Sequence, residues 1–131
     1  MSKTENLKVG KWGEEIALDY LKNNNYKILE KIFKCKIGEI DLIAKTNDII
    51  VFVEVKTRSS DMFGHPREAV NYYKQKKIRS VALNYLKYKN LLNFSCRFDV
   101  IEILDGNITH LENCFWLKII EYFGMHNHKI L

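Results

Sequence analysis

The sequence predicts an α/β protein in which helices pack against one central mixed sheet. Three observations support this class. The chain opens with apolar residues at helical spacing, continues with two segments rich in β-branched residues around a short polar turn, and then repeats the order of helix, strands and helix. Its 131 residues include one proline and show no repeat or linker, so we expect one domain.

Residues 7–23 are expected to form a helix that ends at three consecutive asparagines, residues 23–25. Its apolar face consists of Ile16, Ala17, Tyr20 and Leu21. Strands are expected next at residues 26–35, 38–44 and 49–56. The polar residues 45–48 fit a tight turn, so the last two of these strands should form an antiparallel hairpin.

The second half of the chain repeats this pattern after a polar loop at residues 58–64. A helix is expected at residues 74–89, with an apolar stripe formed by Ile78, Val81, Ala82, Tyr85 and Leu86. Strands at residues 97–104 and 108–111 should be joined by an Asp-Gly turn. Apolar residues at helical spacing between Phe115 and Phe123 indicate a C-terminal amphipathic helix.

The composition narrows the class of partner. A formal charge of +5 and a pI near 9.1 favour an anionic partner, either nucleic acid or an anionic membrane surface. The three cysteines are far apart and lack paired spacing, which argues against a disulfide framework and against a structural zinc site. The N-terminus lacks the apolar core of a signal peptide, and no apolar stretch approaches the roughly 20 residues that span a bilayer. We therefore expect a cytoplasmic protein with no membrane partner.

Two carboxylates interrupt the apolar strands of the predicted hairpin: Asp41 in Ile-Asp-Leu-Ile and Glu54 in Val-Glu-Val. A charge in such a strand is costly unless something compensates it, and functional sites are where local rules are expected to break. Lys56 follows Glu54 by two residues, so all three side chains should share one face. Because Mg²⁺ prefers oxygen ligands, the sequence predicts that Asp41 and Glu54 bind Mg²⁺, with Mn²⁺ as an alternative.

The register of the hairpin follows from a turn centred on residues 46 and 47. This turn pairs Ile43 with Ile50, Asp41 with Phe52 and Glu39 with Glu54. Asp41 and Glu54 are then diagonal neighbours on one face, with Cβ atoms roughly 7–8 Å apart, while Ile40 and Leu42 share the other face. Two alternatives to a metal stay open: an ion pair of Lys56 with either carboxylate, or a solvent-exposed face, although Ile50 and Phe52 argue against exposure.

The first predicted helix supplies a third candidate carboxylate. Steps of about 100° per residue place Glu14 beside Leu21 on the inward side, and Glu15 on the polar side. Gly10 and Gly13 would let this helix approach another backbone closely. The alternative is that Glu14 lies at the edge of the core and extends outward.

These residues resemble a known pattern. Residues 38–44, Gly-Glu-Ile-Asp-Leu-Ile-Ala, followed by residues 51–58, Val-Phe-Val-Glu-Val-Lys-Thr-Arg, resemble the core of the PD-(D/E)XK nucleases. More narrowly, the chain from about residue 8 to residue 115 resembles the YraN-like family of small bacterial proteins. Further matching motifs are Gly13-Glu14, Gly64-His65-Pro66, Glu68-Ala69-Val70, Lys74-Gln75, Arg97-Phe98-Asp99-Val100, and His110-Leu111-Glu112-Asn113 with Phe115.

The resemblance implies a restriction-endonuclease-like fold, three layers α/β/α with a central mixed sheet, which archaeal Holliday-junction resolvases share. It implies an endonuclease-like domain at residues 1–115. Residues 116–131 lie beyond the usual end of the family's pattern, and we expect them to form a C-terminal helical extension of the same domain. The implied roles are metal ligands for Asp41 and Glu54, catalytic lysine for Lys56, helix-borne acid for Glu14 and accessory position for Gln75. The proline of the motif's name is absent, because Ile40 precedes Asp41.

A nucleic-acid substrate is expected to meet a group of polar residues beyond the hairpin: Arg58, Arg67, Lys74, Gln75, Lys76 and Lys77. Lysine and arginine neutralise phosphates without reading sequence, and Tyr72 and Tyr73 could stack on bases. For each residue alone, a solvated charge or a packed tyrosine is the competing interpretation.

The leading hypothesis is an Mg²⁺-dependent nuclease that hydrolyses phosphodiester bonds in nucleic acid, with DNA, including branched or single-stranded DNA, as the expected substrate. The metal would lower the pKa of the attacking water, and Lys56 would orient that water or stabilise the developing charge. One alternative is a nucleic-acid-binding module that keeps the endonuclease fold without catalysis. Another is an adaptor that uses the C-terminal apolar helix, a surface that also leaves a homodimer open.

Overall fold

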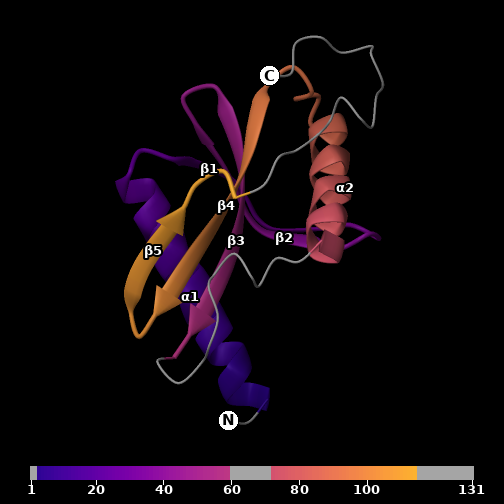
Figure 1. Cartoon of the computed structure of the whole chain (residues 1–131). Coiled ribbons are helices and arrows are strands. Elements are labelled where there is room, and N and C mark those ends of the chain that lie inside the picture. The colour runs from indigo at the N-terminus through magenta and orange to yellow at the C-terminus, as the bar shows by residue number, and fades with distance from the viewer. Residues whose placement is uncertain (1–2, 60–71, 115–131) are drawn as a thin grey trace.

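Figure 1 shows the computed structural model, which describes residues 3–59 and 72–114, with side chains from residue 11 onward. Its elements are α1 (Lys3–Asn23), β1 (Lys27–Lys34), β2 (Glu39–Thr46), β3 (Ile49–Arg58), α2 (Tyr72–Tyr88), β4 (Ser95–Leu104) and β5 (Asn107–Leu111). The strands form one sheet in the order β1-β2-β3-β4-β5; β3 and β4 are parallel, and the other neighbours are antiparallel. The predicted α/β class with a central mixed sheet is confirmed. The predicted C-terminal helix and the extension at residues 116–131 lie outside the described residues.

The central strand β3 is buried on both faces because each face is covered by a helix (Figure 1). Ile50 and Phe52 pack into a cluster with α2, whereas Val51 and Val53 pack into a second cluster with α1. The buried helix residues in these clusters are Ala17 and Leu21 from α1, and Ile78, Val81, Ala82, Tyr85 and Leu86 from α2. The predicted apolar stripe of the second helix is thus confirmed in full. Neither helix, within the residues described, is long and apolar enough to cross a membrane.

Both helices end in the same hydrogen-bonded motif. At the end of α1, the Tyr26 N–H donates to the Leu21 carbonyl over 2.9 Å, and Asn25 adopts a φ of 67°. At the end of α2, the Leu91 N–H donates to the Leu86 carbonyl over 2.7 Å, again next to an asparagine with positive φ. Asparagine tolerates this left-handed conformation better than most residues, so the predicted helix end at residues 23–25 is confirmed.

The turn between β2 and β3 is centred one residue later than predicted. Thr46 pairs with Ile49, and Asn47 enters the turn with a φ of 52°, as tight two-residue hairpin turns require. The observed pairs include Ile43 with Phe52 and Leu42 with Val53. The predicted pairs Ile43–Ile50, Asp41–Phe52 and Glu39–Glu54 are therefore wrong. The observed pairing stops at Leu42 and Val53, so it gives Asp41 no partner, and the predicted diagonal relation of Asp41 and Glu54 stays a prediction.

Strand β2 departs from regular alternation at Asp41. Ile40 and Ile43 belong to the cluster beneath α2, although they are three positions apart, and Leu42 belongs to the opposite cluster. The prediction that Ile40 and Leu42 share one face is wrong, because a regular period of two does not continue through this position. The irregularity leaves Asp41 at a local break in the sheet.

The neighbouring strand is distorted at the same level. Ile32 of β1 adopts a φ of 49°, a conformation that is rare for a β-branched residue. The residues on either side of it pair with Leu42 and Ile40 of β2, which places Ile32 beside Asp41. Non-glycine residues with positive φ are costly and cluster at functional sites, so this kink directs attention to Asp41.

A buried ion-pair network ties β4 and β5 to the end of α1. The Asp99 carboxylate is fully buried; Arg97 donates to it through Nε at 2.9 Å and Nη2 at 3.0 Å, and His110 Nε2 lies 2.7 Å away. Arg97 also donates to the Tyr26 hydroxyl, and the Tyr20 hydroxyl lies 3.0 Å from His110 Nδ1. Burial alone would raise the pKa of Asp99, but these hydrogen bonds hold it below its usual value. The network fixes the sheet to α1.

Candidate metal centre

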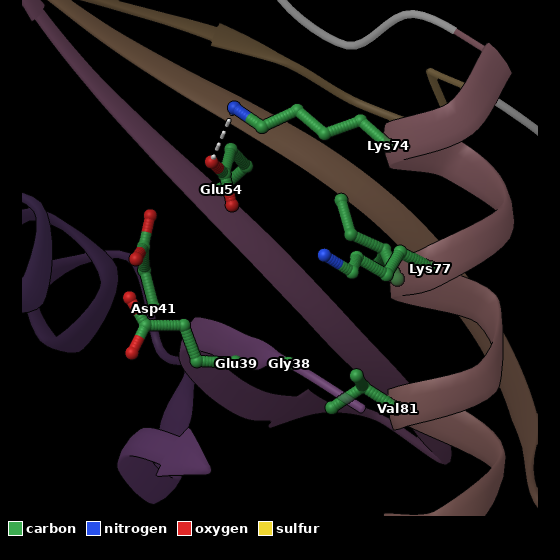
Figure 2. Close-up of a pocket in the computed structure, with 8 residues that line it drawn as sticks. Gly38, Glu39, Asp41, Glu54, Lys74, Lys77 and Val81 are labelled. Atoms are coloured by element: carbon green, nitrogen blue, oxygen red, sulfur yellow. Dashed lines mark hydrogen bonds and ion pairs between the residues drawn. The ribbon is translucent and has the colours of Figure 1, made fainter. Parts of the chain in front are cut away.

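A cavity of about 340 Å³ lies between the strands β2 and β3 and the helix α2. Its lining residues are Gly38, Glu39, Asp41, Glu54, Lys74, Lys77, Ile78 and Val81. Figure 2 shows three carboxylates on the strand side of this cavity, with Lys74 and Lys77 extending toward them from α2. The structure thus brings Asp41 and Glu54 together on one cavity, as the sequence predicts.

Asp41 is held by the backbone of the neighbouring strand. The Val55 N–H of β3 donates a hydrogen bond to Asp41 Oδ2 over 2.8 Å, so the Asp41 side chain accepts from the backbone of the adjacent strand. Burial, and next the nearby charge of Glu54, raise the pKa of Asp41 to about 7. Within the described parts of the chain, Asp41 forms no ion pair, so the Val55 hydrogen bond and the nearby charge of Lys56 only partly offset the cost of its charge.

Glu54 is held by two lysines at a single oxygen atom. Lys56 Nζ lies 3.6 Å and Lys74 Nζ 3.4 Å from Glu54 Oε1. Figure 2 shows the other oxygen of this carboxylate on the side away from Lys74. The predicted alternative of an ion pair between Lys56 and Glu54 therefore exists, but Asp41 takes no part in an ion pair among the described residues.

The two lysines affect each other because they share this oxygen. Burial and the neighbouring Lys74 lower the pKa of Lys56. Burial opposes protonation of Lys74 as well, yet its contacts with Lys56 and Glu54 raise its pKa overall. Lys74 is therefore the residue of the pair that holds its proton more firmly.

Glu14 reaches the edge of this centre from α1. Gly13 makes the approach possible, because a Cβ at this position would overlap the Thr57 Oγ1 of β3. Burial, and then the charges of Glu39 and Glu54, raise the pKa of Glu14. Glu14 is half-buried and Glu15 exposed, which confirms the predicted facing of the helix.

The charges of Glu14, Asp41 and Glu54 affect one another's pKa or that of a neighbour, but these carboxylates do not converge on one point. Among the residues that the structure describes, no three His, Cys, Asp or Glu side chains are placed to hold a metal ion together. The candidate ligands remain the pair Asp41 and Glu54, and Glu39 lines the same cavity. Metal binding by Asp41 and Glu54 stays a prediction, as does the role of Glu14.

The predicted phosphate-binding residues have different surroundings. The side chains of Lys76 and Lys77 are exposed, and the Gln75 carbonyl accepts a hydrogen bond from Arg79 Nε over 3.3 Å. Arg58 ends β3 instead of opening a loop, and its Nε lies 3.5 Å from Glu102 Oε1 in a mostly buried ion pair. Arg67 lies outside the described residues. Binding of nucleic acid by any of them stays a prediction.

The sequence did not identify Lys74 as part of the carboxylate centre. The residue of α2 that contacts Glu54 is Lys74, whereas the resemblance implied Gln75 as the accessory position. A signal was present, because Lys74 and Lys77 precede Ile78 and Val81 at the spacing of the buried helical stripe. Continuing that stripe by one turn toward the N-terminus would have placed both lysines beside the strands.

The fold and the cavity define a small α/β protein in which two carboxylates and a lysine of the central sheet lie close to a lysine of α2. Comparison with known proteins supplies the family. The model of the uncharacterised protein family UPF0102 matches residues 13–103, a segment that contains Glu14, Asp41, Glu54 and Lys56. The chain belongs to this family.

Relatives of similar length cover most of the chain. A UPF0102 protein of Clostridium acetobutylicum is 48% identical over 116 residues, which cover 88% of this chain and 93% of the relative. Another, of Thermodesulfovibrio yellowstonii, is 49% identical over 84% of this chain and 97% of its own length. A third, of Caldanaerobacter subterraneus subsp. tengcongensis, is 54% identical over 79% of this chain and 84% of its own length.

Proposed function

We propose that this protein is a metal-dependent nuclease that hydrolyses phosphodiester bonds in nucleic acid, with DNA as the expected substrate. The observation that carries the proposal is the state of Asp41. It is a half-buried carboxylate beside a second carboxylate, its pKa is raised to about 7, and no lysine in the described residues forms an ion pair with it. Carboxylates in a cavity whose pKa is strongly shifted are typical of functional sites. A divalent cation bound between Asp41 and Glu54 would offset the repulsion between their charges.

The fold supports the same assignment. The sheet begins with three antiparallel strands, and α2 then leads to the parallel strand β4. Helices cover both faces, which agrees with a restriction-endonuclease-like arrangement of three layers (Figure 1). The PD-(D/E)XK resemblance rests on Asp41, Glu54 and Lys56, and these residues lie on the adjacent strands β2 and β3. Because folds host many activities, the cavity carries more of the argument than the topology.

The residues present fit Mg²⁺ or Mn²⁺. One oxygen of Asp41 accepts from Val55 and one oxygen of Glu54 meets the lysines, so each carboxylate keeps a second oxygen for a cation. Mg²⁺ in enzymes commonly uses one or two carboxylates together with water and substrate phosphate, which suits a set of two ligands. When bound, it would supply a Lewis acid and lower the pKa of the attacking water.

The remaining groups would act on the substrate. Lys56, beside Glu54, would orient the attacking water or stabilise the negative charge that develops on the phosphate. Lys74 and Lys77, which line the cavity from α2, would neutralise the phosphate groups next to the cleaved bond. Glu14, at the edge of the centre, would act through water or support a second metal ion.

The test is cleavage of labelled single-stranded, duplex and four-way-junction DNA with Mg²⁺ or Mn²⁺, beside Asp41→Asn. The variant keeps the shape of the side chain and removes its charge. We expect the wild type to cleave at least one substrate, EDTA to stop the reaction, and the variant to lose on the order of 10²–10³-fold in rate.

Binding of Mn²⁺, followed by electron paramagnetic resonance, gives a second readout that does not depend on activity. Weaker binding by Asp41→Asn supports the ligand assignment. If both proteins bind DNA equally and neither cleaves it, the nuclease proposal is wrong and the alternative of a non-catalytic nucleic-acid-binding module replaces it.

A further inference from the structure

A second and more open cavity, of about 460 Å³, adjoins the candidate metal centre along α2. We call it the tyrosine groove; its lining residues are Ile37, Tyr73, Lys74, Lys76, Lys77 and Ser80. Lys74 and Lys77 line both cavities, so the tyrosine groove and the metal centre share a wall. Figure 2 shows these two lysines extending from α2 toward the carboxylates. A ligand in the groove therefore lies next to the metal centre, with Lys74 and Lys77 between them.

The tyrosine groove combines two kinds of surface. Tyr73 is 82% exposed and Ile37 is 41% exposed, so water covers an aromatic ring and an aliphatic side chain in one depression. Lys76 and Lys77 are exposed as well, and neither ammonium group forms an ion pair within residues 3–59 and 72–114. Apolar faces next to unpaired cations suit a ligand that carries flat apolar rings and anionic groups in alternation.

Single-stranded nucleic acid has this alternation. Its bases expose their faces, and each is followed by a phosphate, whereas the bases of a duplex are stacked internally and present only their edges. Proteins bind single strands by stacking bases on aromatic side chains beside a basic groove that follows the backbone.

We propose that the tyrosine groove binds a single-stranded segment of nucleic acid, with a base stacked on Tyr73 and the flanking phosphates on Lys76 and Lys77. The strand then continues past Lys74 into the carboxylate cavity, a step that rests on the proposed nuclease function. The stacking itself does not depend on catalysis. Unpaired segments are therefore the substrate class that reaches the metal centre.

The chain provides a matched control at the other end of α2. Tyr88 is 76% exposed, similar to Tyr73, but it does not line either cavity. Lys89 Nζ lies 5.1 Å from the centre of its ring, so a lysine of the protein already lies over this tyrosine. Substitution of Tyr88 removes an exposed tyrosine from the same helix without touching the groove.

The experiment measures fluorescence anisotropy of a labelled oligodeoxyadenylate in EDTA, so that binding is followed without cleavage. A labelled hairpin duplex of the same length is the second probe. We expect Tyr73→Ala to weaken single-strand binding about tenfold, since stacking of a base contributes roughly 1–3 kcal/mol. Tyr73→Phe should bind as the wild type does, because it keeps the ring, and Tyr88→Ala should also bind normally. Duplex binding should not respond to Tyr73→Ala.

The lysines are tested through salt dependence. For single strands, the slope of log affinity against log salt changes by about 0.7 for each phosphate contact. The double variant Lys76→Ala/Lys77→Ala should therefore reduce the slope by about 1.4 units. Circular dichroism of each variant verifies that α2 is intact.

The proposal is overturned if Tyr73→Ala binds the single strand as tightly as the wild type, or loses affinity for both probes equally. These outcomes are separate from those of the nuclease assay. Binding that depends on Tyr73 without any cleavage would support the groove and contradict the nuclease. Cleavage that is unchanged by Tyr73→Ala, together with unchanged binding of the single strand, would support the nuclease and contradict the groove.

Discussion

Asp41 and Glu54 are adjacent, but they are held by different devices. Asp41 is fixed by one backbone N–H at 2.8 Å, whereas Glu54 is fixed by two ammonium groups at 3.4 and 3.6 Å. A backbone donor is rigid and neutral, so it orients Asp41 without adding positive charge. The lysines add two positive charges, which stabilise Glu54 and also repel a cation. Lys74 should therefore oppose metal binding while it assists the reaction of an anionic substrate.

This opposition gives a prediction for Lys74→Met, which keeps the length of the side chain and removes its charge. We expect metal affinity to rise by about 0.7 kcal/mol, or roughly threefold, because one repelling charge is lost in a partly solvated site. Cleavage should fall on the order of 10-fold to 100-fold, because a cation beside the phosphate is lost. Calorimetric titration with Mn²⁺ and the cleavage assay measure the two effects.

A structural role for Lys74 would move both quantities in the same direction, since a distorted cavity binds metal less tightly and cleaves more slowly. Lys89→Met, which alters a lysine just beyond the far end of α2, is the control and should change neither. Weaker Mn²⁺ binding by Lys74→Met would contradict the assignment.

Helix α1 contributes to the centre through a close contact with β3. Gly13 packs on Thr57, and Glu14 is the next residue, so the spacing of helix and strand sets how far Glu14 reaches. Gly13→Ala should destabilise the protein by about 1–2 kcal/mol, because overpacking outweighs the gain of roughly 1 kcal/mol in helix propensity. Thermal or urea unfolding measures this effect.

The effect of Gly13→Ala on stability should change sign when Thr57 is also replaced. In a Thr57→Ala background the obstructing Oγ1 is gone, and the ideal Cβ at residue 13 would then lie 3.3 Å from the remaining Cβ. There Gly13→Ala should be neutral or stabilising, since the propensity term remains. Equal effects of Gly13→Ala in both backgrounds would show that Thr57 does not set the spacing of α1 and β3.

The elements that could be predicted from the sequence are those whose signals are local. The apolar stripe of α2, the asparagine end of α1 and the Asp-Gly turn before β5 each depend on residues within a few positions. Strand parity also placed Asp41 and Glu54 on one cavity, because an error of two in the pairing leaves the faces unchanged.

The remaining features depend on contacts between distant segments. The centre of the turn between β2 and β3 is set by Asn47, which adopts a positive φ as the first residue of the turn, whereas Thr46 still pairs with Ile49 in the strands. The break in β2 at Asp41 coincides with a kink in β1, which no local pattern signals. Lys74 contacts Glu54 because of the position at which α2 packs along β3, and the local sequence does not specify this position. Tertiary packing decides each of these points.

At the scale of the whole molecule, the centre lies where both helix layers meet one stretch of sheet. Glu14 approaches from α1 and Lys74 from α2, while Asp41 and Glu54 belong to the sheet between the helices. The carboxylates gather inside a chain of net charge +5, so an anionic substrate is drawn to the protein, although the cavity itself is acidic. A divalent cation would reverse the sign of that local field.

The metal-free protein should therefore lose stability as pH rises. The pKa of Asp41 is about 7 in the folded state against an ordinary value of 3.8, so between these values the folded state holds a proton that the unfolded state has lost. The stabilisation is fully present below pH 3.8 and is lost as pH rises through about 7. At 1.36 kcal/mol per unit, the change is on the order of 2–4 kcal/mol.

Comparison of the wild type with Asp41→Asn isolates this group, because other titrations cancel. In EDTA, the stability of Asp41→Asn relative to the wild type should increase between about pH 5 and pH 8, as measured by urea unfolding. Mg²⁺ at pH 8 should then stabilise the wild type, by an amount that grows with the logarithm of its concentration, and leave the variant unchanged. A pH-independent difference would mean that Asp41 is already ionised at neutral pH. A wild type indifferent to both Mg²⁺ and Mn²⁺ would rule out the metal centre, since a cation that binds only the folded protein must stabilise it.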